Sequence, residues 1–299
     1  MTATPSAASD AGRPLFGIFL VALTTLFFAL TDVFSKQLTM AYPVPVVMAI
    51  RYFTSFILLT TLFGPRMGKR LWATKRTRLV LVRAGILTLA SLTMGHALRL
   101  MPVGETIAIL YLSPFAVMAL AVPILGEKIT PWGVFFAILG FCGVLLVLRP
   151  GSGLDPVGVL WALGNASCAT AFHLLTRSLS RTETAISMLF FVTLVGTVFF
   201  VITAIPHMAT VRPPLRDLGL MAFVGITATS GHFLFAVAYR EAPAAIIAPL
   251  NYLHLVWAAL LGWAIFNHTP DGISVAGMAI IVGAGAALAV NGHISKTKP

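Results

Sequence analysis

The sequence predicts an all-α integral membrane protein whose ten transmembrane helices form two inverted five-helix repeats around a central cavity. The first observation is composition: of 299 residues, 58% are hydrophobic and only 10% are charged, whereas about a quarter of the residues in a soluble domain carry a charge. The second is a series of apolar runs near the roughly 20 residues that a helix needs to cross a bilayer. The third is an internal repeat. Together these observations exclude a soluble globular protein.

The apolar runs follow one another along nearly the whole chain. The gaps between them hold charged residues or turn formers, such as Arg149-Pro150-Gly151-Ser152-Gly153. Two gaps, Arg99–Val103 and Arg240–Pro243, are so short that each predicts a tight helical hairpin. The runs are too long, and alternate too little between apolar and polar residues, for the strands of a membrane β-barrel. The predicted spans are residues 15–36, 43–64, 79–99, 104–124, 132–149, 157–177, 184–204, 217–238, 244–265 and 273–292.

The distribution of basic residues predicts the orientation, because cytoplasmic loops are enriched in Lys and Arg. Thirteen of the 20 Lys and Arg residues fall at one set of gaps and ends and five at the other, while Arg51 and Arg83 lie inside or at the ends of spans. Both termini are therefore expected in the cytoplasm, with residues 1–14 and 293–299 as tails and 1–14 disordered. The net charge of +11 fits anionic lipid headgroups in the inner membrane rather than nucleic acid.

The internal repeat appears when the sequence is aligned with itself at one fixed shift, which we call the repeat offset. At this shift Ala97-Leu98-Arg99-Leu100-Met101-Pro102 falls on Ala238-Tyr239-Arg240-Glu241-Ala242-Pro243, and Tyr111-Leu112 falls on Tyr252-Leu253. The predicted repeats are 15–149 and 157–292. Since each holds five spans, an odd number, the second must cross the membrane in the opposite sense. Inverted repeats of this kind are typical of secondary transporters that open a central site to either side.

Charged residues inside spans mark a candidate gate, because each costs at least about 2.5 kcal/mol at the bilayer centre and needs a partner or water. Asp32 and Arg51 have similar expected depths, so we expect an ion pair between the first two spans, with Lys36 one turn from Asp32. This cluster is either a staple between helices or a charge that changes partners, or takes up a proton, when the gate opens. Glu105 is expected to be solvated or to cap a hairpin; facing the cavity, it would attract a substrate ammonium group.

A second set of polar and aromatic residues lies deeper and predicts the cavity. Asn251 and His254 share one helical face, and Pro114 removes a backbone donor in the repeat-related region. Aromatic rings beside amides and hydroxyls suit an amphipathic guest. The expected cavity residues are Tyr111, Ser113, Asn165, His173, Ser230, His232, Asn251, Tyr252, His254 and Trp257.

Small residues in the fifth and tenth spans indicate close helix packing. Gly140 and Gly143 in the fifth span, and Gly277, Gly283 and Gly285 in the tenth, are spaced for such contacts. These two spans are therefore expected to support the core from its periphery or to form the interface of a homodimer.

Several motifs together resemble the EamA branch of the drug/metabolite transporter superfamily. They are Lys36 at the end of the first helix, Arg51 in the second, Ala97-Leu98-Arg99 followed by Pro102, then Pro114 and Gly126-Glu127. The resemblance covers nearly the whole chain and implies efflux of amino acids, aromatic ones included, or of related metabolites by alternating access. The second repeat departs from the pattern, with Asn267-His268 in place of Gly126-Glu127 and Leu255 in place of Pro114, so the two copies are not expected to do identical work.

The expected function is therefore secondary-active export of amino acids or related amphipathic metabolites, driven by a substrate gradient or by protons. The chain has no Gly-rich phosphate loop with Lys-Ser/Thr, which excludes ATP hydrolysis by that route. The alternatives are a multidrug or other metabolite carrier of the same fold, such as a nucleotide-sugar carrier, a passive channel, and a membrane-embedded lipid-modifying enzyme. Scattered histidines disfavour the enzyme. We expect no cofactor, no catalytic or metal site and no nucleic-acid partner; the expected partners are a small-molecule substrate and the lipid bilayer.

Overall fold

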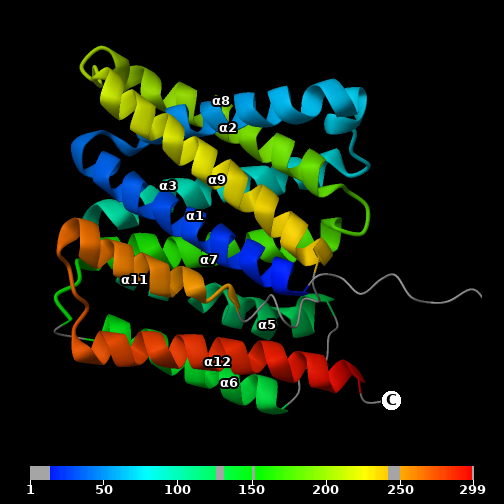
Figure 1. Ribbon diagram of the computed structural model, residues 1–299, viewed down its shortest axis with the longest axis vertical. Helices are drawn as coiled ribbons and strands as arrows, with labels where there is room; N and C mark the ends of the chain where they lie inside the picture. The colour runs from blue at the N-terminus through cyan, green and yellow to red at the C-terminus, as the bar shows by residue number, and fades with distance from the viewer. Residues whose placement is uncertain (1–13, 126–130, 150–151, 242–249, 298–299) are drawn as a thin grey trace, which may run out of the picture.

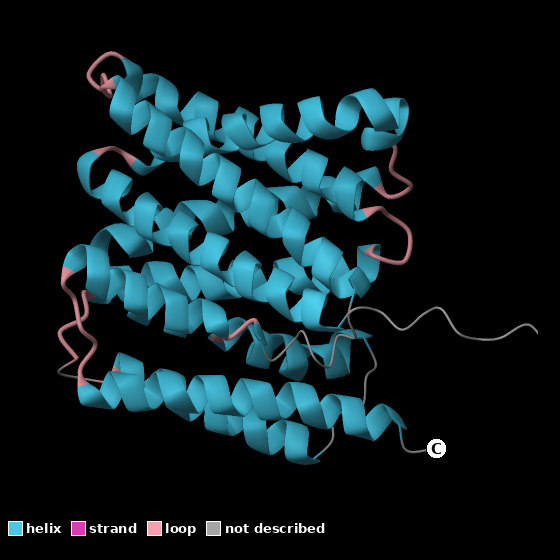
Figure 2. Ribbon diagram, viewed as in Figure 1, coloured by secondary structure: helices cyan, strands magenta, loops and turns pink. Residues whose placement is uncertain are grey.

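The computed structural model describes residues 14–125, 131–149, 152–241 and 250–297, and within them it contains helices and turns but no strand (Figure 2). Eight helical spans of the described residues, with Val103–Leu120 counted as one, are long and apolar enough to cross a membrane, and two shorter apolar stretches, Leu253–Phe266 and Gly272–Ala287, follow. The helices are α1 (Pro14–Ala41), α2 (Val44–Met67), the 3₁₀ turn η1 (Gly68–Leu71), α3 (Thr77–Leu100), α4 (Val103–Leu110), α5 (Leu112–Leu125), α6 (Pro131–Leu148), α7 (Pro156–Leu179), α8 (Ala185–Met208), α9 (Leu215–Glu241), α11 (Leu253–Phe266) and α12 (Gly272–Thr297).

Local signals in the sequence place several helix ends. Asp155 caps α7, its carboxylate accepting from the backbone N–H of Gly158, and Pro156 occupies the first helical position, where a missing N–H costs nothing. Thr184 caps α8 in the same way. The apolar interior of each helix leaves no alternative to intrahelical hydrogen bonds, because lipid offers the backbone no partner.

The main helix contacts cross between the two halves of the chain. α1 packs on α9, α3 on α7, α2 on α8, and α6 on α12 (Figure 1). The repeat offset relates α1 to α7 and α3 to α9, so the first two contacts are copies of each other. The contacts of α2 with α8 and of α6 with α12 each join a helix to its own repeat mate. The fold thus has a pseudo-twofold axis between its halves.

The two repeats are inverted. Near the end of α1, Lys36 donates hydrogen bonds to the carbonyls of Leu98 and Met101, 2.8 and 2.7 Å away, at the end of α3. At the start of α7, a Cβ on Gly158 would lie 2.5 Å from Met101 Cγ. α7 therefore begins at the end of the bundle where α1 finishes, as Figure 1 shows. We call the end at which α1 begins the N-face, and the other end the distal face.

A close glycine contact joins α6 and α12, which lie together at one side of the bundle (Figure 1). A Cβ on Gly143 would lie 2.8 Å from the Gly277 carbonyl oxygen, and one on Gly277 would lie 2.6 Å from the Gly143 carbonyl oxygen. Gly140 faces Phe115 and Gly285 faces Tyr252. These glycines allow close packing between helices of the same chain, in line with the expectation that the fifth and tenth spans support the core. The homodimer interface stays a prediction.

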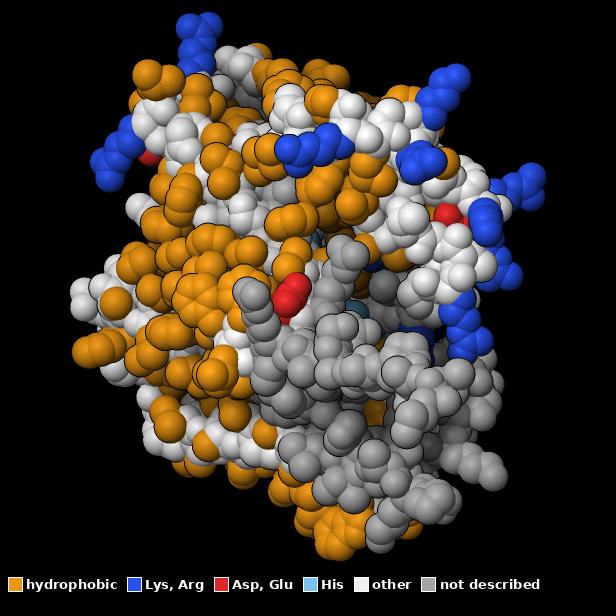
Figure 3. Space-filling view, turned by 45° about the vertical axis from the view of Figure 1, so that its right-hand side comes forward, with side chains coloured by type: hydrophobic (Ala, Val, Ile, Leu, Met, Phe, Trp, Pro, Cys, Tyr) orange, Lys and Arg blue, Asp and Glu red, His pale blue; other side chains and the backbone are white. Residues whose placement is uncertain are grey.

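The outer surface fits a membrane. In Figure 3 hydrophobic side chains cover much of the left of the visible face, and most Lys and Arg side chains lie along its top and right. Exposed residues on the surface of the bundle are large and apolar, including Phe135, Ile138, Ile202 and Trp263. Two details differ from expectation: α1 continues beyond Lys36 to Ala41, and a break at Tyr111 divides the fourth span into α4 and α5. The expected hairpin residues 242–243, Pro249, and the motif Gly126-Glu127 lie outside the described residues, as do residues 1–13 and 298–299.

Candidate functional site

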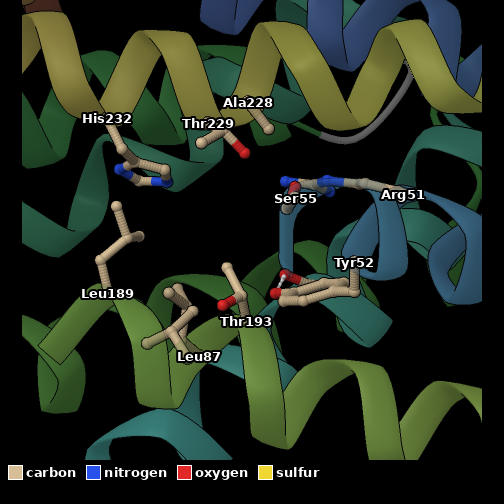
Figure 4. Close-up of a pocket in the computed structure, with 11 residues that line it drawn as sticks. Arg51, Tyr52, Ser55, Leu87, Leu189, Thr193, Ala228, Thr229 and His232 are labelled. Atoms are coloured by element: carbon tan, nitrogen blue, oxygen red, sulfur yellow. Dashed lines mark hydrogen bonds between the residues drawn. The ribbon is translucent and has the colours of Figure 1, made fainter. Parts of the chain in front are cut away.

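A pocket of about 50 Å³ lies at the centre of the bundle, between α2, α3, α8 and α9 (Figure 4). Arg51, Tyr52 and Ser55 of α2 face it from one side, and His232 of α9 faces it from the other. Ligand pockets of about 300–1,000 Å³ are usual, so this one has space for only a few water molecules. Its lining residues are Arg51, Tyr52, Ser55, Leu87, Ser91, Leu189, Val192, Thr193, Ala228, Thr229 and His232.

The pocket lies on the pseudo-twofold axis. The repeat offset relates four pairs among its lining residues: Arg51 with Val192, Tyr52 with Thr193, Leu87 with Ala228, and Ser91 with His232. A site on the axis is approached equally by both halves, so an exchange of their tilts uncovers it from the N-face or from the distal face.

Arg51 lines this pocket and Arg83 lies outside its lining, and neither has a carboxylate partner among the residues that the structure describes. Arg51, half-buried, contacts Met48 Sδ through Nη1 at 3.5 Å and lies 5.5 Å from the centre of the Tyr52 ring. Arg83, 7% exposed, donates from Nε to Thr176 Oγ1 at 2.7 Å and from Nη1 to the Met188 carbonyl at 3.4 Å.

The hydroxyl groups of the pocket are oriented by the helix backbone. Ser55 and Thr229 both donate to the carbonyl of Gly225, at 3.1 and 2.9 Å, and Thr193 donates to the carbonyl of Phe190 at 2.9 Å. Because a hydroxyl has one hydrogen and two lone pairs, these three oxygens are left as acceptors. Tyr52 and Ser91 share a 2.6 Å hydrogen bond across the pocket wall.

Asp32 pairs with His254, not with Arg51. The distance from His254 Nε2 to Asp32 Oδ2 is 2.9 Å, and the structure places no ion pair between Asp32 and Arg51. The expected pair was wrong because similar depth does not make two side chains face each other: α1 packs on α9 and α11, which turns Asp32 toward the second repeat. Lys36 does not share the carboxylate either, since it binds the two carbonyls at the end of α3.

Four of the expected cavity residues meet where the repeat-related fourth and ninth spans are interrupted. Tyr111 ends α4, and Asn251 and Tyr252 form a turn before α11. The Tyr111 hydroxyl donates to the carbonyl of Asn251 at 2.6 Å, and the Tyr111 and Tyr252 rings lie 4.8 Å apart. His254 completes this group, 6.3 Å from Tyr111 between ring centres. Phe28 lies between His254 and His232, and so separates this cluster from the central pocket.

The remaining expected cavity residues do not join either group. Ser113 accepts a hydrogen bond from Thr170 at 3.3 Å, and Asn165 donates to the Ala90 carbonyl at 2.6 Å. His173 is exposed and packs against the neighbouring Phe172 ring. Ser230 and Trp257 are both half-buried. The single shared cavity expected from the sequence is therefore divided, with His232 in the central pocket and the other residues around it.

Glu105 is buried rather than solvated. It is 3% exposed and lies 2.9 Å from His268 Nε2 through Oε1, while Oε2 is buried without a hydrogen-bond partner in the described part of the chain. A second cavity, of about 210 Å³, lies at this distal end and is lined by residues that include Lys36, Pro102, Phe266 and His268.

Two repeat-related ties join the halves, one at each face, and the Arg149–Asp271 and Glu105–His268 pairs join them further at the distal face. At the N-face, the carboxylate of Glu183, before α8, accepts hydrogen bonds from the backbone N–H groups of Lys75 and Arg76, before α3. At the distal face, the Tyr42 hydroxyl, before α2, donates to the Asp217 carboxylate in the first turn of α9. The repeat offset relates Tyr42 to Glu183 and Arg76 to Asp217, so the ties are repeat mates.

The model of the EamA-like transporter family matches residues 15–149 and again residues 156–290. The two matches begin at residues 15 and 156, which the repeat offset pairs with each other. The family model therefore recognises the same internal repeat. The chain belongs to the EamA-like transporter family.

Relatives of this EamA-like chain are transporters of several small metabolites. It is 29% identical over 268 residues to the S-adenosylmethionine uptake transporter of Rickettsia bellii, covering 89% of this chain and 90% of the relative. It is 28% identical over 305 residues to the riboflavin transporter of Rhizobium johnstonii, covering 98% and 97%. It is 26% identical over 275 residues to the pseudopaline exporter CntI of Pseudomonas aeruginosa, covering 89% and 93%.

A solved crystal structure shares the fold, with a TM-score of 0.68, 20% identity, and coverage of 95% of this chain and 98% of that one. The family match, the relatives and the apolar helices identify the EamA-like chain as an integral inner-membrane transporter of small metabolites. In the described residues, no group of three or more His, Cys, Asp and Glu residues lies together as a metal site would require.

Sequence reasoning missed most of the central pocket of this EamA-like transporter. Tyr52, Ser55, Ser91, Thr193 and Thr229 look like ordinary hydroxyl residues in apolar spans. The signal that would have found them is the repeat itself: Tyr52 and Thr193, and Ser91 and His232, are polar at both related positions. Arg83 was left aside as a residue near a span end, yet its side chain is directed into the bundle.

Proposed function

We propose that this EamA-like transporter exports amino acids or related small amphipathic metabolites by alternating access. The observation that supports this most directly is the small pocket on the pseudo-twofold axis, with one repeat-related tie at each face. With the Glu183 and Tyr42 ties both formed, the two halves are held together on both sides of the pocket. Release of one tie at a time would open the pocket to one side.

The chemistry of the pocket supports an amphipathic substrate. Arg51 and His232 offer hydrogen-bond donors, the hydroxyls of Ser55, Thr193 and Thr229 offer acceptors, and the Tyr52 ring offers an apolar face. The relative from Rickettsia bellii is named for S-adenosylmethionine, which carries an amino-acid group. An amino acid or a metabolite built on one would use both the donors and the acceptors.

In this proposal the Asp32–His254 pair couples transport to protons. The pair lies near the interrupted ninth span and makes no ion pair with either arginine, so it can gain or lose a proton without disturbing the charges at the pocket. Proton uptake by Asp32 would release His254, which lies beside Tyr111. The pair would thus link protonation to the contact between the two repeats.

A carrier of a different metabolite is the second candidate, favoured by the range of compounds in the relatives' names. A panel of labelled compounds separates the two. We would reconstitute the protein in liposomes and measure uptake of amino acids, S-adenosylmethionine and riboflavin, with and without the same unlabelled compound on the far side.

Saturable uptake of an amino acid that rises with trans substrate supports the proposal. Saturable uptake confined to S-adenosylmethionine or riboflavin favours the second candidate. Uptake that never saturates would instead indicate a channel, and no flux of any compound would contradict a carrier of this class. The double variant Glu183→Gln/Tyr42→Phe, reconstituted in the same liposomes, serves as the protein with both ties weakened.

A further inference from the structure

The cavity of about 210 Å³ at the distal face, which we call the distal cavity, lies where the two halves of the chain meet. It is about four times as large as the central pocket of about 50 Å³ and a little below the usual range of ligand pockets, about 300–1,000 Å³. The end of α1 and the turn from α3 to α4 line it from the first half, and the end of α11 lines it from the second (Figure 1). A small molecule held here would therefore contact both halves outside the central pocket.

Lys36 lines the distal cavity with a half-buried ammonium group, about 8 Å from the end of α1. It donates hydrogen bonds to the carbonyls of Leu98 and Met101, at 2.8 and 2.7 Å. These carbonyls belong to the last turn of α3, where the helix dipole favours a positive charge. Because an ammonium group has three N–H donors, Lys36 keeps one donor for a group inside the cavity.

An aromatic and apolar wall lies beside this ammonium group. The Lys36 Nζ atom is 5.5 Å from the centre of the Phe266 ring, and Leu100 and Val103 also line the cavity. Asn267 ends α11 in the left-handed conformation, with φ 53°, and the chain then places His268 on the same cavity. The cavity thus offers a charged donor next to an apolar surface.

The Glu105 carboxylate beside the distal cavity is engaged with His268 and does not pair with Lys36. Glu105 is 3% exposed, its Oε1 lies 2.9 Å from His268 Nε2, and it is not among the residues that line the cavity. The structure places no ion pair between Glu105 and Lys36 in the described residues. The ammonium group is therefore held by neutral carbonyls and remains able to receive an anion.

The internal repeat indicates that this chemistry belongs to one end of the molecule. The repeat offset relates Leu100 to Glu241 and His268 to Glu127. The corresponding positions of the other half thus carry two acids where the distal cavity has an apolar side chain and an imidazole. Like charges repel, so those positions in the sequence disfavour an anion that the distal cavity can accept.

We propose that the distal cavity is a second substrate site, in which Lys36 binds the carboxylate of an amphipathic metabolite and Phe266 packs against its apolar part. This inference rests on the proposed function, because it names where the substrate is held between the central pocket and the distal face. A carboxylate would complete the hydrogen bonds of the ammonium group through a charge-assisted bond. Since both halves line the cavity, their relative movement would take the site apart and release the molecule.

The test measures how a ligand protects one thiol in the distal cavity. Leu100 lines the cavity and is 41% exposed, so Leu100→Cys, with Cys142→Ser and Cys168→Ala, provides a thiol that a maleimide can reach. We would label the purified full-length protein over a range of concentrations of phenylacetate or of phenylacetamide, which have nearly the same shape and differ in charge. Phenylacetate should slow the labelling at concentrations at least about tenfold lower than phenylacetamide, because a hydrogen bond between charged groups is stronger.

A control thiol and an anionic lipid identify what fills the cavity. Leu79→Cys lies near the opposite end of α3 and is 38% exposed, and neither probe should slow its labelling. A lipid headgroup also joins an anion to an apolar body, so short-chain phosphatidylglycerol is titrated in the same way. Phenylacetate should protect Leu100→Cys in the absence of this lipid.

Variants assign the preference for the acid to the ammonium group. Lys36→Gln should abolish the difference between the two probes, whereas Arg99→Gln removes an exposed cation near the end of α3 and should preserve it. Phe266→Ala should weaken both probes by a similar factor and leave their ratio unchanged. Size-exclusion elution and the melting temperature show whether each variant is folded, and Phe266→Ala is the second test where Lys36→Gln unfolds.

Three outcomes overturn the inference: equal protection by the acid and the amide, a preference for the acid that survives in Lys36→Gln, and protection by phosphatidylglycerol alone. The last outcome would assign the cavity to a lipid. Failure here is separate from failure of the proposed function. Saturable, trans-stimulated uptake of an amino acid, together with an unprotected Leu100→Cys, would leave the carrier standing and remove the distal site.

Discussion

The hydroxyl of Tyr111 donates a 2.6 Å hydrogen bond to the backbone carbonyl of Asn251. The two residues occupy breaks in repeat-related spans, so the bond joins the halves of the transporter where each helix is interrupted. The Asn251 carbonyl also accepts from the backbone N–H of His254 at 3.1 Å. The Tyr111 hydroxyl therefore supplies a second donor to this oxygen, which has two lone pairs.

Tyr111→Phe removes this bond and keeps the aromatic stack with Tyr252. We expect a stability loss of about 0.5–1.5 kcal/mol, the range for one hydrogen bond, and slower transport. Tyr252→Phe is the matched control, since the structure assigns the Tyr252 hydroxyl no hydrogen-bond partner in the described residues. Melting temperatures and initial uptake rates of both variants provide the comparison, and equal effects would contradict the role given to Tyr111.

Gly285→Ala should disturb the packing of the Tyr252 ring in the same region. A Cβ at Gly285 would lie 1.8 Å from Tyr252 Cζ, whereas nothing lies within 4 Å of a Cβ at Gly283. Overpacking of this kind costs about 1–3 kcal/mol. We expect a lower melting temperature for Gly285→Ala and no loss for Gly283→Ala on the same helix; a neutral Gly285→Ala would mean that the Tyr252 ring is free to move.

The two face ties predict opposite changes in accessibility. Tyr42→Phe weakens the distal tie, and Glu183→Gln weakens the N-face tie, so each should expose the pocket to a different side. We would place Ala228→Cys in a background of Cys142→Ser and Cys168→Ala, and label membrane vesicles of both orientations with an impermeant thiol reagent. Labelling should rise from one side in the first variant and from the other side in the second. Equal rises from both sides would argue against alternation.

Asp32→Asn tests the proton role. The variant cannot take up a proton at this position, so transport should lose its dependence on an imposed pH gradient while the protein still elutes as a folded species. His254→Gln removes the other partner and should weaken the same dependence. Transport by Asp32→Asn with the wild-type pH profile would discard proton coupling at this pair.

Asp271 gives a prediction for stability against pH outside the membrane. It caps α12: the backbone N–H of Ser274, and then the Arg149 guanidinium, lower the pKa of the Asp271 carboxyl to about 2 from its usual 3.8. A lowered pKa gives stability that is present above pH 3.8 and lost as pH falls through 2.

The melting temperature of the wild type should therefore fall more between pH 4 and pH 2 than that of Asp271→Asn, and the two should run parallel above pH 5. Parallel curves over the whole range would show that the cap does not depend on the charge.

The sequence predicts the fold of this protein well because lipid leaves the chain little choice. Long apolar runs must become helices, an odd number of spans per repeat must invert the second copy, and the repeat offset reappears in the helix contacts and in the family matches. Side-chain partners are less predictable. Asp32 and Arg51 have matching depths, but the rotation of each helix is set by packing between distant segments, and that packing turns Asp32 toward His254.

Arg83 shows the same limit in predicting side-chain partners from sequence. Its position near the start of a span is typical of an arginine that reaches the headgroups, and nothing local in the sequence shows that Thr176 and Met188 hold it inward. The pocket hydroxyls were missed because Ser and Thr commonly bond to the preceding turn of their own helix.

Placement of Arg51 and Arg83 on one half has an electrical consequence. When α2 and α3 move along the membrane normal relative to the second repeat, two positive charges move with them. A full crossing of the membrane field is worth about 2.3 kcal/mol per charge for each 100 mV, so even a partial displacement does work against the voltage. The balance between the two open forms should accordingly shift with membrane potential.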